Sequence, residues 1–582
     1  MSLKKWGYIT VALILLVLVF TWSDGTMFAY EAEDSVYGDV NGDWQVTSTD
    51  YLLIKKIFNG QKVTAKVKDR ADINCDGKIT SSDYLILKRL FSGQSVTVYT
   101  KTLAAQPAIN DPGNRVVYTV SRVFTSNMVL QRDKIINVWG WSNNIGGYIY
   151  GEFMGEKRYA QIDKNGEWML QFSPKAYTTE GQTLTIGPKS GKQTVFENIL
   201  VGDVWIVSGQ SNAEYSFAEM ATYYTELYDR INKNDHIRLY REDKNDAYIG
   251  QTLRVHGLQD NVIMPYRWTI TTVDTVDSFS AVGYMFVKEL ADHTDVPQGI
   301  VMATAGGCKI EDFMDPDTAT KVVQHGTFWP EAQAIYKYFI APFRHMTFTG
   351  MLFYQGESDN LWASEYPDSL TKCVAGWRDQ FDSDFAFYNV QCTSHKALEA
   401  NPKEWGGLPF LRAAQLDAYY KIPNSYLIST IDVGYRLRPW YEPEEDYAHT
   451  FNKWAIGQRA ANMALARYYQ KDGYDYSYVS CPIPEKVSWY DDYVIIDFKN
   501  VGDGLKAYEG ELIGFKILQN DKTLVTTKAS IVDKDTVKIS LTGATRKISG
   551  ICYGIEHSAL LEEANLVNSN NIPCPTFCFY TK

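Results

Sequence analysis

The sequence contains no long run of basic residues, and its 57 lysines and arginines are outnumbered by 69 aspartates and glutamates. The formal net charge is therefore -12. A protein that follows a nucleic acid backbone needs a basic stripe to neutralise the phosphates. This charge balance argues against nucleic acid as a partner.

Cysteine and histidine are scarce, with 8 of each in 582 residues. The cysteines are scattered, and no group of cysteines and histidines has the spacing of a zinc site. Only Cys574 and Cys578 lie close together in the sequence. The sequence therefore predicts mostly free, buried thiols rather than a dense disulfide framework.

Long apolar runs are also missing, apart from one near the first residues. Lys4 and Lys5 precede an apolar run over residues 6–22, and small and polar residues follow it. This arrangement is typical of a secretory signal. We therefore expect residues 1–32 to be a signal peptide, and the protein to be secreted and extracellular, with no stable membrane span after cleavage.

An internal repeat follows, with DVNGDWQVTSTDYLLIKKIFNG at 39–60 and DINCDGKITSSDYLILKRLFSG at 72–93. Each copy places oxygen ligands at loop positions 1, 3, 5 and 12, and a backbone carbonyl at position 7. This is the spacing that Ca²⁺ requires. The sequence predicts two structural calcium ions, held by Asp39, Asn41, Asp43, Gln45 and Asp50 and by Asp72, Asn74, Asp76, Lys78 and Asp83.

A short helix is expected after each loop, over 51–58 and 84–91, each followed by Asn-Gly or Ser-Gly. The duplicated loop and helix resemble a type I dockerin, the module that attaches cellulosomal enzymes to scaffoldin cohesins. The resemblance implies that residues 34–95 bind a cohesin. It places the cohesin contacts at Ser48, Thr49, Ser81 and Ser82.

At 582 residues the chain is too long for one core, and its pattern changes along its length. Proline and glycine mark 96–115 as a linker. Residues 116–199 read as the short strands of a β-sandwich-like domain, 200–475 alternate strands with helices, and 483–582 are β-rich. The strands expected in the α/β domain are 203–208, 299–305, 349–355, 385–391 and 425–432, and the helices 280–292, 367–380, 408–421 and 450–470.

The α/β domain begins with VGDVWIVSGQSNA at 201–213, where an apolar strand ends in small residues. A serine on that turn would lie at the carboxyl edge of a parallel sheet, beside the amide donors of the next helix. Ser211 is therefore the candidate nucleophile. Ala213 stands where the nucleophile elbow of α/β-hydrolases has its last glycine.

Two later loops would meet Ser211 at the same edge. Gly306 and Gly307 follow one predicted strand, and bare glycines let a backbone N–H face a reacting oxygen. Gln355 lies at the end of another predicted strand and could add an amide donor. The sequence predicts that Gly306 or Gly307, together with Gln355, stabilises an oxyanion. We interpret Glu357 as a hydrogen-bonding scaffold group.

His449 is the candidate general base, because Asp446 lies three residues before it on the same predicted loop. Asp446 could hold the imidazole tautomer while His449 takes the proton from Ser211. Asp432 is the alternative orienting acid.

Together these residues resemble the SGNH hydrolases, and more narrowly the sialate O-acetylesterases and related carbohydrate acetylesterases. The resemblance implies a flavodoxin-like catalytic domain, with the nucleophile at Ser211 and the base at His449. Thr450 and Phe451 follow His449 where the family has proline, and Cys308 and Lys309 replace Thr-Pro. The likeness runs through VFTSNMVLQRD (123–133), VGDVWIVSGQSN, FSAVGYMF (279–286), FYQGESDN (353–360), AHTFNKWAIGQR (448–459) and ANLVNSNNIPCPTFCF (564–579).

The sequence thus predicts a secreted, cellulosome-associated O-acetylesterase that removes acetyl groups from plant polysaccharides by Ser-His-Asp acyl transfer, without a catalytic cofactor. The acidic loop 435–447 is expected to disfavour the carboxylate of a sialic acid. The alternatives are a sialate O-acetylesterase proper, a non-catalytic carbohydrate-binding component of a cellulosome, and an SGNH lipase or thioesterase.

Overall fold

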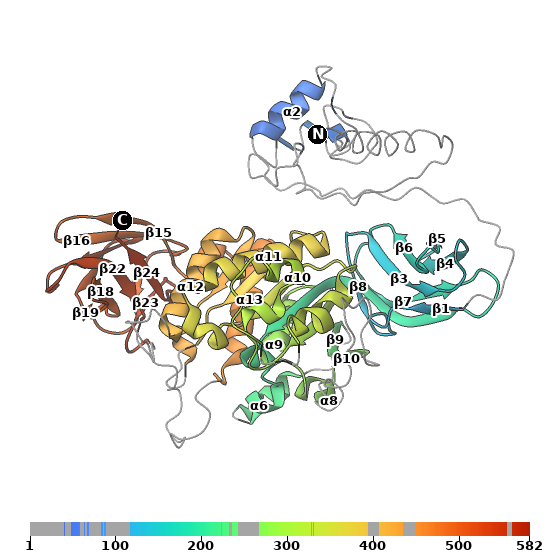
Figure 1. Cartoon of the computed structure of the whole chain (residues 1–582). Helices are drawn as coiled ribbons and strands as arrows, with labels where there is room; N and C mark the ends of the chain where they lie inside the picture. The colour runs from blue at the N-terminus through green and yellow to red at the C-terminus, as the bar shows by residue number, and fades with distance from the viewer. Residues whose placement is uncertain are drawn as a thin grey trace, which may run out of the picture. The chain divides into compact units, whose positions relative to one another are not determined.

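The computed structural model divides the chain into two compact units, residues 1–97 and residues 98–582 (Figure 1). The predicted signal peptide and linker lie outside the described residues. No helix among the described residues is both long enough and apolar enough to cross a bilayer. The structure describes residues 40, 48–58, 63, 67–68, 71, 79, 83–84, 87–88, 117–222, 224–231, 236–241, 267–327, 329, 331–393, 407–434, 449–555 and 561–581.

The first unit contains helix α2 (Ser48–Phe58), which begins three residues before the predicted helix. Its buried residue Ile54 shares a small core with Val40, Ala71 and Leu87. In the second copy of the repeat, the described residues 83–84 and 87–88 are helical, where the sequence predicts the second helix.

The second unit begins with short strands, as the sequence predicts. Two groups of strands share one core through Val138, Phe153, Leu170 and Phe172. One group is a sheet of β1 (Tyr118–Val120), β3 (Ile136–Ser142) and β6 (Glu167–Phe172), and the other contains β2 (Val129–Gln131), β4 (Tyr148–Phe153), β5 (Glu156–Gln161) and β7 (Thr178–Gly187).

Strand β8 (Thr194–Gly209) crosses the boundary that the sequence predicts at residue 199. Its first part pairs with β2 and β7, and its second part pairs with β11 (Gln298–Thr304) and β12 (Gly350–Tyr354). Every residue from Ile199 to Gly209 is buried. One strand therefore belongs to both the β-rich region and the α/β region.

The central sheet has the order β10-β9-β11-β8-β12-β13-β14, and its neighbouring strands are parallel except at β10. Without the two outer strands β9 and β10, the order is 2-1-3-4-5 in chain order, that of a doubly wound sheet. Such a sheet binds its ligands at the point where the strand order reverses, outside the carboxyl ends of the first and third strands. Here these strands are β8 and β12. The remaining strands are β9 (Ile237–Arg241), β10 (Trp268–Ile270), β13 (Ala386–Val390) and β14 (Ser425–Ile428).

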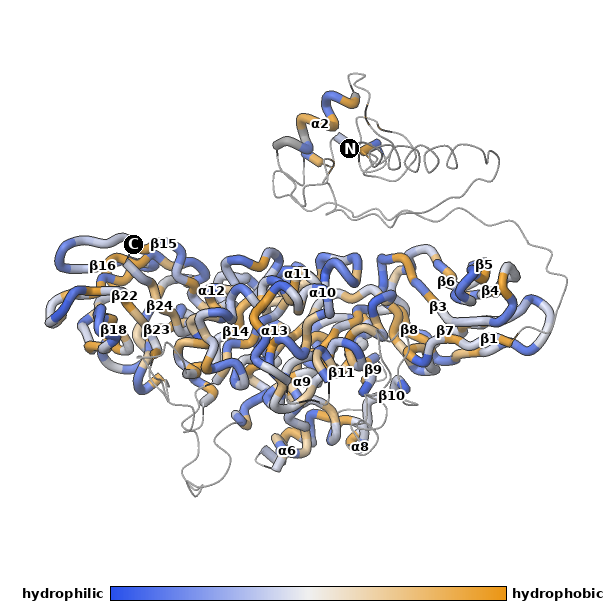
Figure 2. The backbone as a smooth tube through the Cα atoms, viewed as in Figure 1, coloured by the Kyte–Doolittle hydropathy of each residue, from blue (hydrophilic) through white to orange (hydrophobic). Residues whose placement is uncertain are grey.

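Helices cover both faces of this sheet, and the alternating side chains of β8 sort into two cores. Trp205 and Val207 pack in the core that contains α9 (Ala281–His293) and α13 (Lys453–Arg467). Val204 and Ile206 pack in the core that contains α11 (Tyr366–Phe381) and α12 (Leu408–Lys421). Hydrophobic residues accordingly concentrate along the central strands (Figure 2).

Short helical turns complete the α/β region, and several of them lie at the edge that carries the predicted site residues. They are α5 (Ser211–Glu214), α6 (Phe217–Ala221), η1 (Thr225–Arg230), α8 (Val273–Asp277), η2 (Ile310–Phe313), α10 (Pro316–Ala319), the π-helical turn η3 (Tyr336–Ile340), η4 (Ala341–Phe343), η5 (Glu357–Trp362), η6 (Ile431–Val433) and α14 (Tyr476–Val479).

The last region is β-rich, as predicted, and it packs on α12. The side chain of Arg412 is fully buried there and donates to Thr576 Oγ1 at 3.1 Å and to the Gly554 carbonyl at 2.9 Å. Its strands are β15 (Ile483–Trp489), β16 (Tyr493–Lys499), β17 (Lys506–Ala507), β18 (Phe515–Gln519), β19 (Leu524–Thr526), β20 (Ala529–Asp533), β21 (Thr536–Ser540), β22 (Ile548–Tyr553), β23 (Leu566–Val567) and β24 (Phe577–Tyr580).

The described cysteines are mostly buried thiols outside disulfides, as expected from the sequence. One disulfide joins Cys552 on β22 to Cys578 on β24. The other described cysteines form no disulfide and are buried, namely Cys308, Cys373, Cys392, Cys481 and Cys574.

Candidate active site

Ser211 begins helix α5 directly beyond the carboxyl end of β8. The turn that carries it is held by both neighbouring strands, because Gln210 N donates to the Tyr354 carbonyl at 3.0 Å and Ala305 N donates to the Gly209 carbonyl at 2.9 Å. Gly209 has φ +129°, and a Cβ there would lie 2.1 Å from the Tyr354 carbonyl oxygen. Only glycine permits this close approach.

Gly306 lies beside Ser211. A Cβ added to Gly306 would be 3.6 Å from the Ser211 Cβ. The Gly306 amide donates to Glu214 Oε2 at 2.7 Å, so in this conformation a carboxylate holds one of the two predicted backbone donors. Gly307 has φ +71°, and a Cβ there would meet open space.

Gln355 is fully buried directly beyond β12. Its Nε2 donates to the Cys308 carbonyl at 3.0 Å and to Asp359 Oδ2 at 2.5 Å. Its Oε1 accepts a hydrogen bond from the Tyr366 hydroxyl at 2.9 Å. The amide is therefore rigidly placed, and it must exchange one of these hydrogen bonds in order to donate to an oxyanion.

Asp359 is a buried acid that the sequence analysis missed, although it lies in the FYQGESDN segment. Burial raises its pKa to about 8, against hydrogen bonds from Gln355 and the Ile310 amide that lower it. The Ile310 amide donates to Asp359 Oδ2 at 3.0 Å. At neutral pH this side chain is therefore mainly a neutral carboxylic acid.

His449 packs against the end of α5. Its ring centroid lies 5.5 Å from that of Tyr215. The Tyr215 amide in turn donates to the Ser211 carbonyl at 2.8 Å. The structure thus brings the segment of the predicted base to the turn of the predicted nucleophile, across more than 200 residues of sequence.

Asp446 lies outside the described residues. Both carboxylate oxygens of the alternative acid, Asp432, bind Arg459, with Oδ1 at 2.7 Å from Nη1 and Oδ2 accepting from Nη2.

A buried polar group links residues that the sequence analysis did not connect. Asn212 Nδ2 donates to Glu357 Oε1 at 2.5 Å, and Lys453 Nζ donates to Asn212 Oδ1. Glu357 therefore has the hydrogen-bonding partner that a scaffold group requires. All three residues lie in segments that carry the family resemblance, which is the signal that could have pointed to them.

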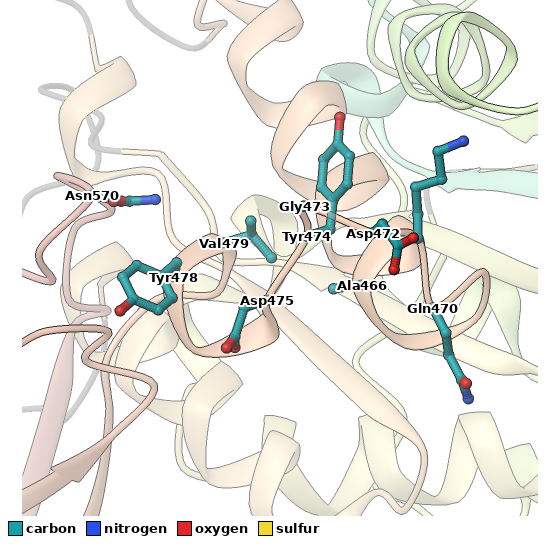
Figure 3. A pocket seen from close by; sticks show the side chains of 10 residues that line it. Ala466, Gln470, Asp472, Gly473, Tyr474, Asp475, Tyr478, Val479 and Asn570 are labelled. Atoms are coloured by element: carbon teal, nitrogen blue, oxygen red, sulfur yellow. The ribbon is translucent and has the colours of Figure 1, made fainter. Parts of the chain in front are cut away.

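A groove of about 590 Å³ lies away from these residues, between the C-terminal end of α13, α14 and a turn of the last β region (Figure 3). Tyr474, Asp475, Tyr478 and Asn570 are among the residues that line it. None of the predicted site residues is among its lining residues.

Two of the predicted calcium ligands lie within the described residues, and both suit a cation. Asp50 and Asp83, the acids at position 12 of each loop, are both fully buried. Asp50 Oδ1 also accepts a hydrogen bond from the Val40 amide at 2.9 Å, which closes the first loop. The other predicted ligands, and the predicted cohesin contacts Ser81 and Ser82, lie outside the described residues. Ser48 and Thr49 are the first two residues of helix α2.

Comparison with known proteins gives matches in two parts of the chain. Residues 201–462 match the family model described as carbohydrate esterase, sialic acid-specific acetylesterase, and residues 37–92 match that of the dockerin type I domain. The sialate O-acetylesterases of Pongo abelii and Homo sapiens are each 24% identical over 325 residues. These matches cover 50% of this chain and 57% of each relative, so the chain spans just over half the length of these relatives.

A carbohydrate acetylesterase from Xanthomonas citri matches in structure, with a TM-score of 0.67 and 26% sequence identity. The match covers 80% of this chain and 100% of that protein.

The doubly wound sheet and these matches liken the central region of the chain to carbohydrate acetylesterases. More narrowly, residues 201–462 match the sialic acid-specific acetylesterase family and residues 37–92 match the type I dockerin domain, which confirms both resemblances seen in the sequence.

Proposed function

We propose that this protein is a secreted, cellulosome-attached carbohydrate O-acetylesterase of the SGNH type that acts by serine acyl transfer. The observation that carries the proposal is the meeting of four segments at one sheet edge. Ser211 and Gly306 lie side by side, Gln355 directly follows the adjacent strand β12, and His449 packs against the end of α5.

In the proposed reaction, Ser211 Oγ attacks the acetyl carbonyl carbon and gives its proton to His449. The backbone amide of Gly306 or Gly307, with Gln355, stabilises the oxyanion. The sugar oxygen leaves with the proton from His449, and water then hydrolyses the acetyl-serine to acetate. Asp446 is the proposed orienting acid, since both oxygens of Asp432 bind Arg459.

The decisive variant is Ser211→Ala, assayed as the full chain on 4-nitrophenyl acetate. We expect acetate release to fall by a factor of about 10⁴ or more, as when a triad nucleophile is lost. Thermal melting provides the control for folding. A variant that melts like the wild type and keeps its rate would exclude the serine mechanism.

The proposed substrates are acetylated plant polysaccharides and their oligosaccharides. The dockerin domain supports this class, because a cellulosome holds its enzymes on plant cell walls and raises their effective concentration there. An acetyl pocket by itself discriminates little between sugars. Contacts to the sugar ring must then set the preference, and the acidic segment 435–447 would disfavour an anionic sugar.

The second candidate is a sialate O-acetylesterase proper, which the relatives from Pongo abelii and Homo sapiens favour. Acetate release from acetylxylan, acetyl-glucomannan and 9-O-acetylsialic acid separates the two. We expect faster release from a neutral plant glycan, and a clear preference for the sialate would establish the second candidate.

A further inference from the structure

A buried lysine lies behind the predicted nucleophile. Lys453 is the first residue of α13, and its side chain is fully buried. Burying an ammonium group is costly unless it is paired. The positive partial charge at a helix N-terminus also disfavours a cation there. Both effects mean that a lysine at this position does not by itself stabilise the fold.

The ammonium group of Lys453 contacts the surroundings of Ser211 on two sides. Its Nζ donates to Asn212 Oδ1, and Asn212 directly follows Ser211. The Nζ atom also lies 4.9 Å from the ring centroid of Tyr354 and 5.4 Å from that of Tyr215. Aromatic faces attract a desolvated cation, so the lysine is held between β12 and the end of α5.

Asn212 transmits this contact to a carboxylate. It is 1% exposed, and its Nδ2 donates to Glu357 Oε1 at 2.5 Å. A carboxylate only accepts and an ammonium only donates, so these two partners fix the amide in one orientation. Glu357 balances the charge of Lys453 across the amide, and together they immobilise the residue next to the nucleophile.

The same lysine is tied to the segment of the predicted base. His449 lies four residues before Lys453, and its ring packs on Tyr215 with the centroids 5.5 Å apart. Phe451 lies between them in sequence, and its ring centroid is 6.0 Å from that of Tyr215. Tyr215 is therefore shared by Lys453, His449 and Phe451.

We propose that Lys453 is a positioning residue that sets the placement of Ser211 relative to His449, through Asn212 on one side and Tyr215 on the other. It acts through these neighbours and not on the substrate. The inference rests on the proposed serine mechanism.

The test compares Lys453→Met with the wild type, as the full chain, on 4-nitrophenyl acetate. Methionine keeps the side-chain volume and removes the charge. We expect kcat to fall about 100-fold with KM within twofold, because misplaced reacting groups slow the chemical step rather than weaken binding. Lys453→Arg keeps the cation, and we expect it to recover at least tenfold in kcat over the methionine variant.

Lys288→Met is the matched control. Lys288 lies on α9, is 6% exposed, and donates to Asp292 Oδ1 at 2.5 Å, so this change also removes a largely buried ammonium. We expect it to lower the melting temperature and to leave kcat unchanged. A Lys453→Met variant that behaves in the same way would overturn the proposal.

If Lys453→Met does not fold, Asn212→Ala decides the question. A tenfold or greater loss of kcat at unchanged KM supports the positioning role, and a wild-type kcat overturns it. An active Ser211→Ala variant would instead refute the serine mechanism itself. The two failures are therefore distinguishable.

Discussion

At the scale of single residues, Glu214 offers a way to choose between the two glycine donors. Its carboxylate accepts the Gly306 amide at 2.7 Å, close to the Ser211 Cβ. If Gly306 stabilises the oxyanion, this carboxylate competes for the donor and repels the developing negative charge. We expect Glu214→Ala to raise kcat on 4-nitrophenyl acetate about tenfold, equivalent to about 1.4 kcal/mol in the barrier.

The nearby Glu219→Ala is a suitable control, because Glu219 Oε2 accepts from the Ser216 amide at 2.7 Å in an exposed capping box of α6. We expect it to leave kcat unchanged. If Glu214→Ala also leaves kcat unchanged or lowers it, Gly306 is not the donor and Gly307 becomes the better candidate.

Asp359 predicts a dependence of stability on pH. Burial raises its pKa from the ordinary value of 3.8 to about 8, so between these values the native state holds a proton that the unfolded chain has lost. The contribution of Asp359 to stability is then fully present below about pH 4 and falls as the pH rises towards 8, by about 1.4 kcal/mol per pH unit. We expect Asp359→Asn, measured by chemical denaturation at several pH values, to lack this slope.

Asp417→Asn is the comparison variant, because burial raises the pKa of Asp417 only to about 6. Its effect should be confined to a narrower range, from about pH 4 to pH 6. Parallel curves for the wild type and Asp359→Asn up to pH 8 would contradict the assignment of a neutral acid.

At the scale of elements, the apolar runs of the α/β region predicted its strands and helices closely. The five expected strands and four expected helices are all present, because a buried parallel strand is a near-continuous hydrophobic run. Strand β9 was missed. It contains two charged residues, Arg238 and Arg241, and such residues are typical of an exposed segment. In the fold, however, Arg238 is only 2% exposed.

The candidate site was predictable to the extent that it follows strand ends. Ser211, Gly306 and Gln355 each lie at or shortly after the end of a predicted strand, and parallel strands share one carboxyl edge. The pairing of Asn212 with Lys453 could not be predicted in this way. The two residues are 241 positions apart, and no local spacing relates them.

Gly209 shows how closely the ends of β8 and β12 must approach. A Cβ there would lie 2.1 Å from the Tyr354 carbonyl oxygen, at a φ of +129° that side chains rarely adopt. We expect Gly209→Ala to destabilise the protein by about 3 kcal/mol and to abolish activity, because Ser211 would move. Thermal melting and esterase rate are the measurements.

Gly146→Ala is the control that separates the cost of a positive φ from the cost of a steric clash. Gly146 has φ +79°, but a Cβ there would have nothing within 4 Å. We expect a loss of about 1 kcal/mol and normal activity. Equal losses for the two variants would mean that the contact with Tyr354 is unimportant.

At the scale of the whole molecule, calcium and catalysis are expected to belong to different units. The predicted calcium ligands lie in residues 1–97 and the candidate active site in residues 98–582. We expect EDTA to abolish binding of a matching cohesin and to leave acetate release from 4-nitrophenyl acetate unchanged. Added Ca²⁺ should restore the binding.

Asp83→Ala complements this experiment, because it removes one buried acid of the second loop. We expect weaker cohesin binding and an unchanged esterase rate. Binding that survives EDTA would contradict the calcium-dependent dockerin, and loss of esterase activity in EDTA would contradict catalysis without a metal.

Strand β8 has a consequence for how such proteins can be recombined. Because its first part pairs in the β-rich region and its second part in the central sheet, a crossover near residue 199 would divide one strand between two parents. Functional chimaeras should therefore arise from crossovers in the stretch before residue 117. Evolution by module exchange must therefore pass on the two regions that share β8 as one inherited block.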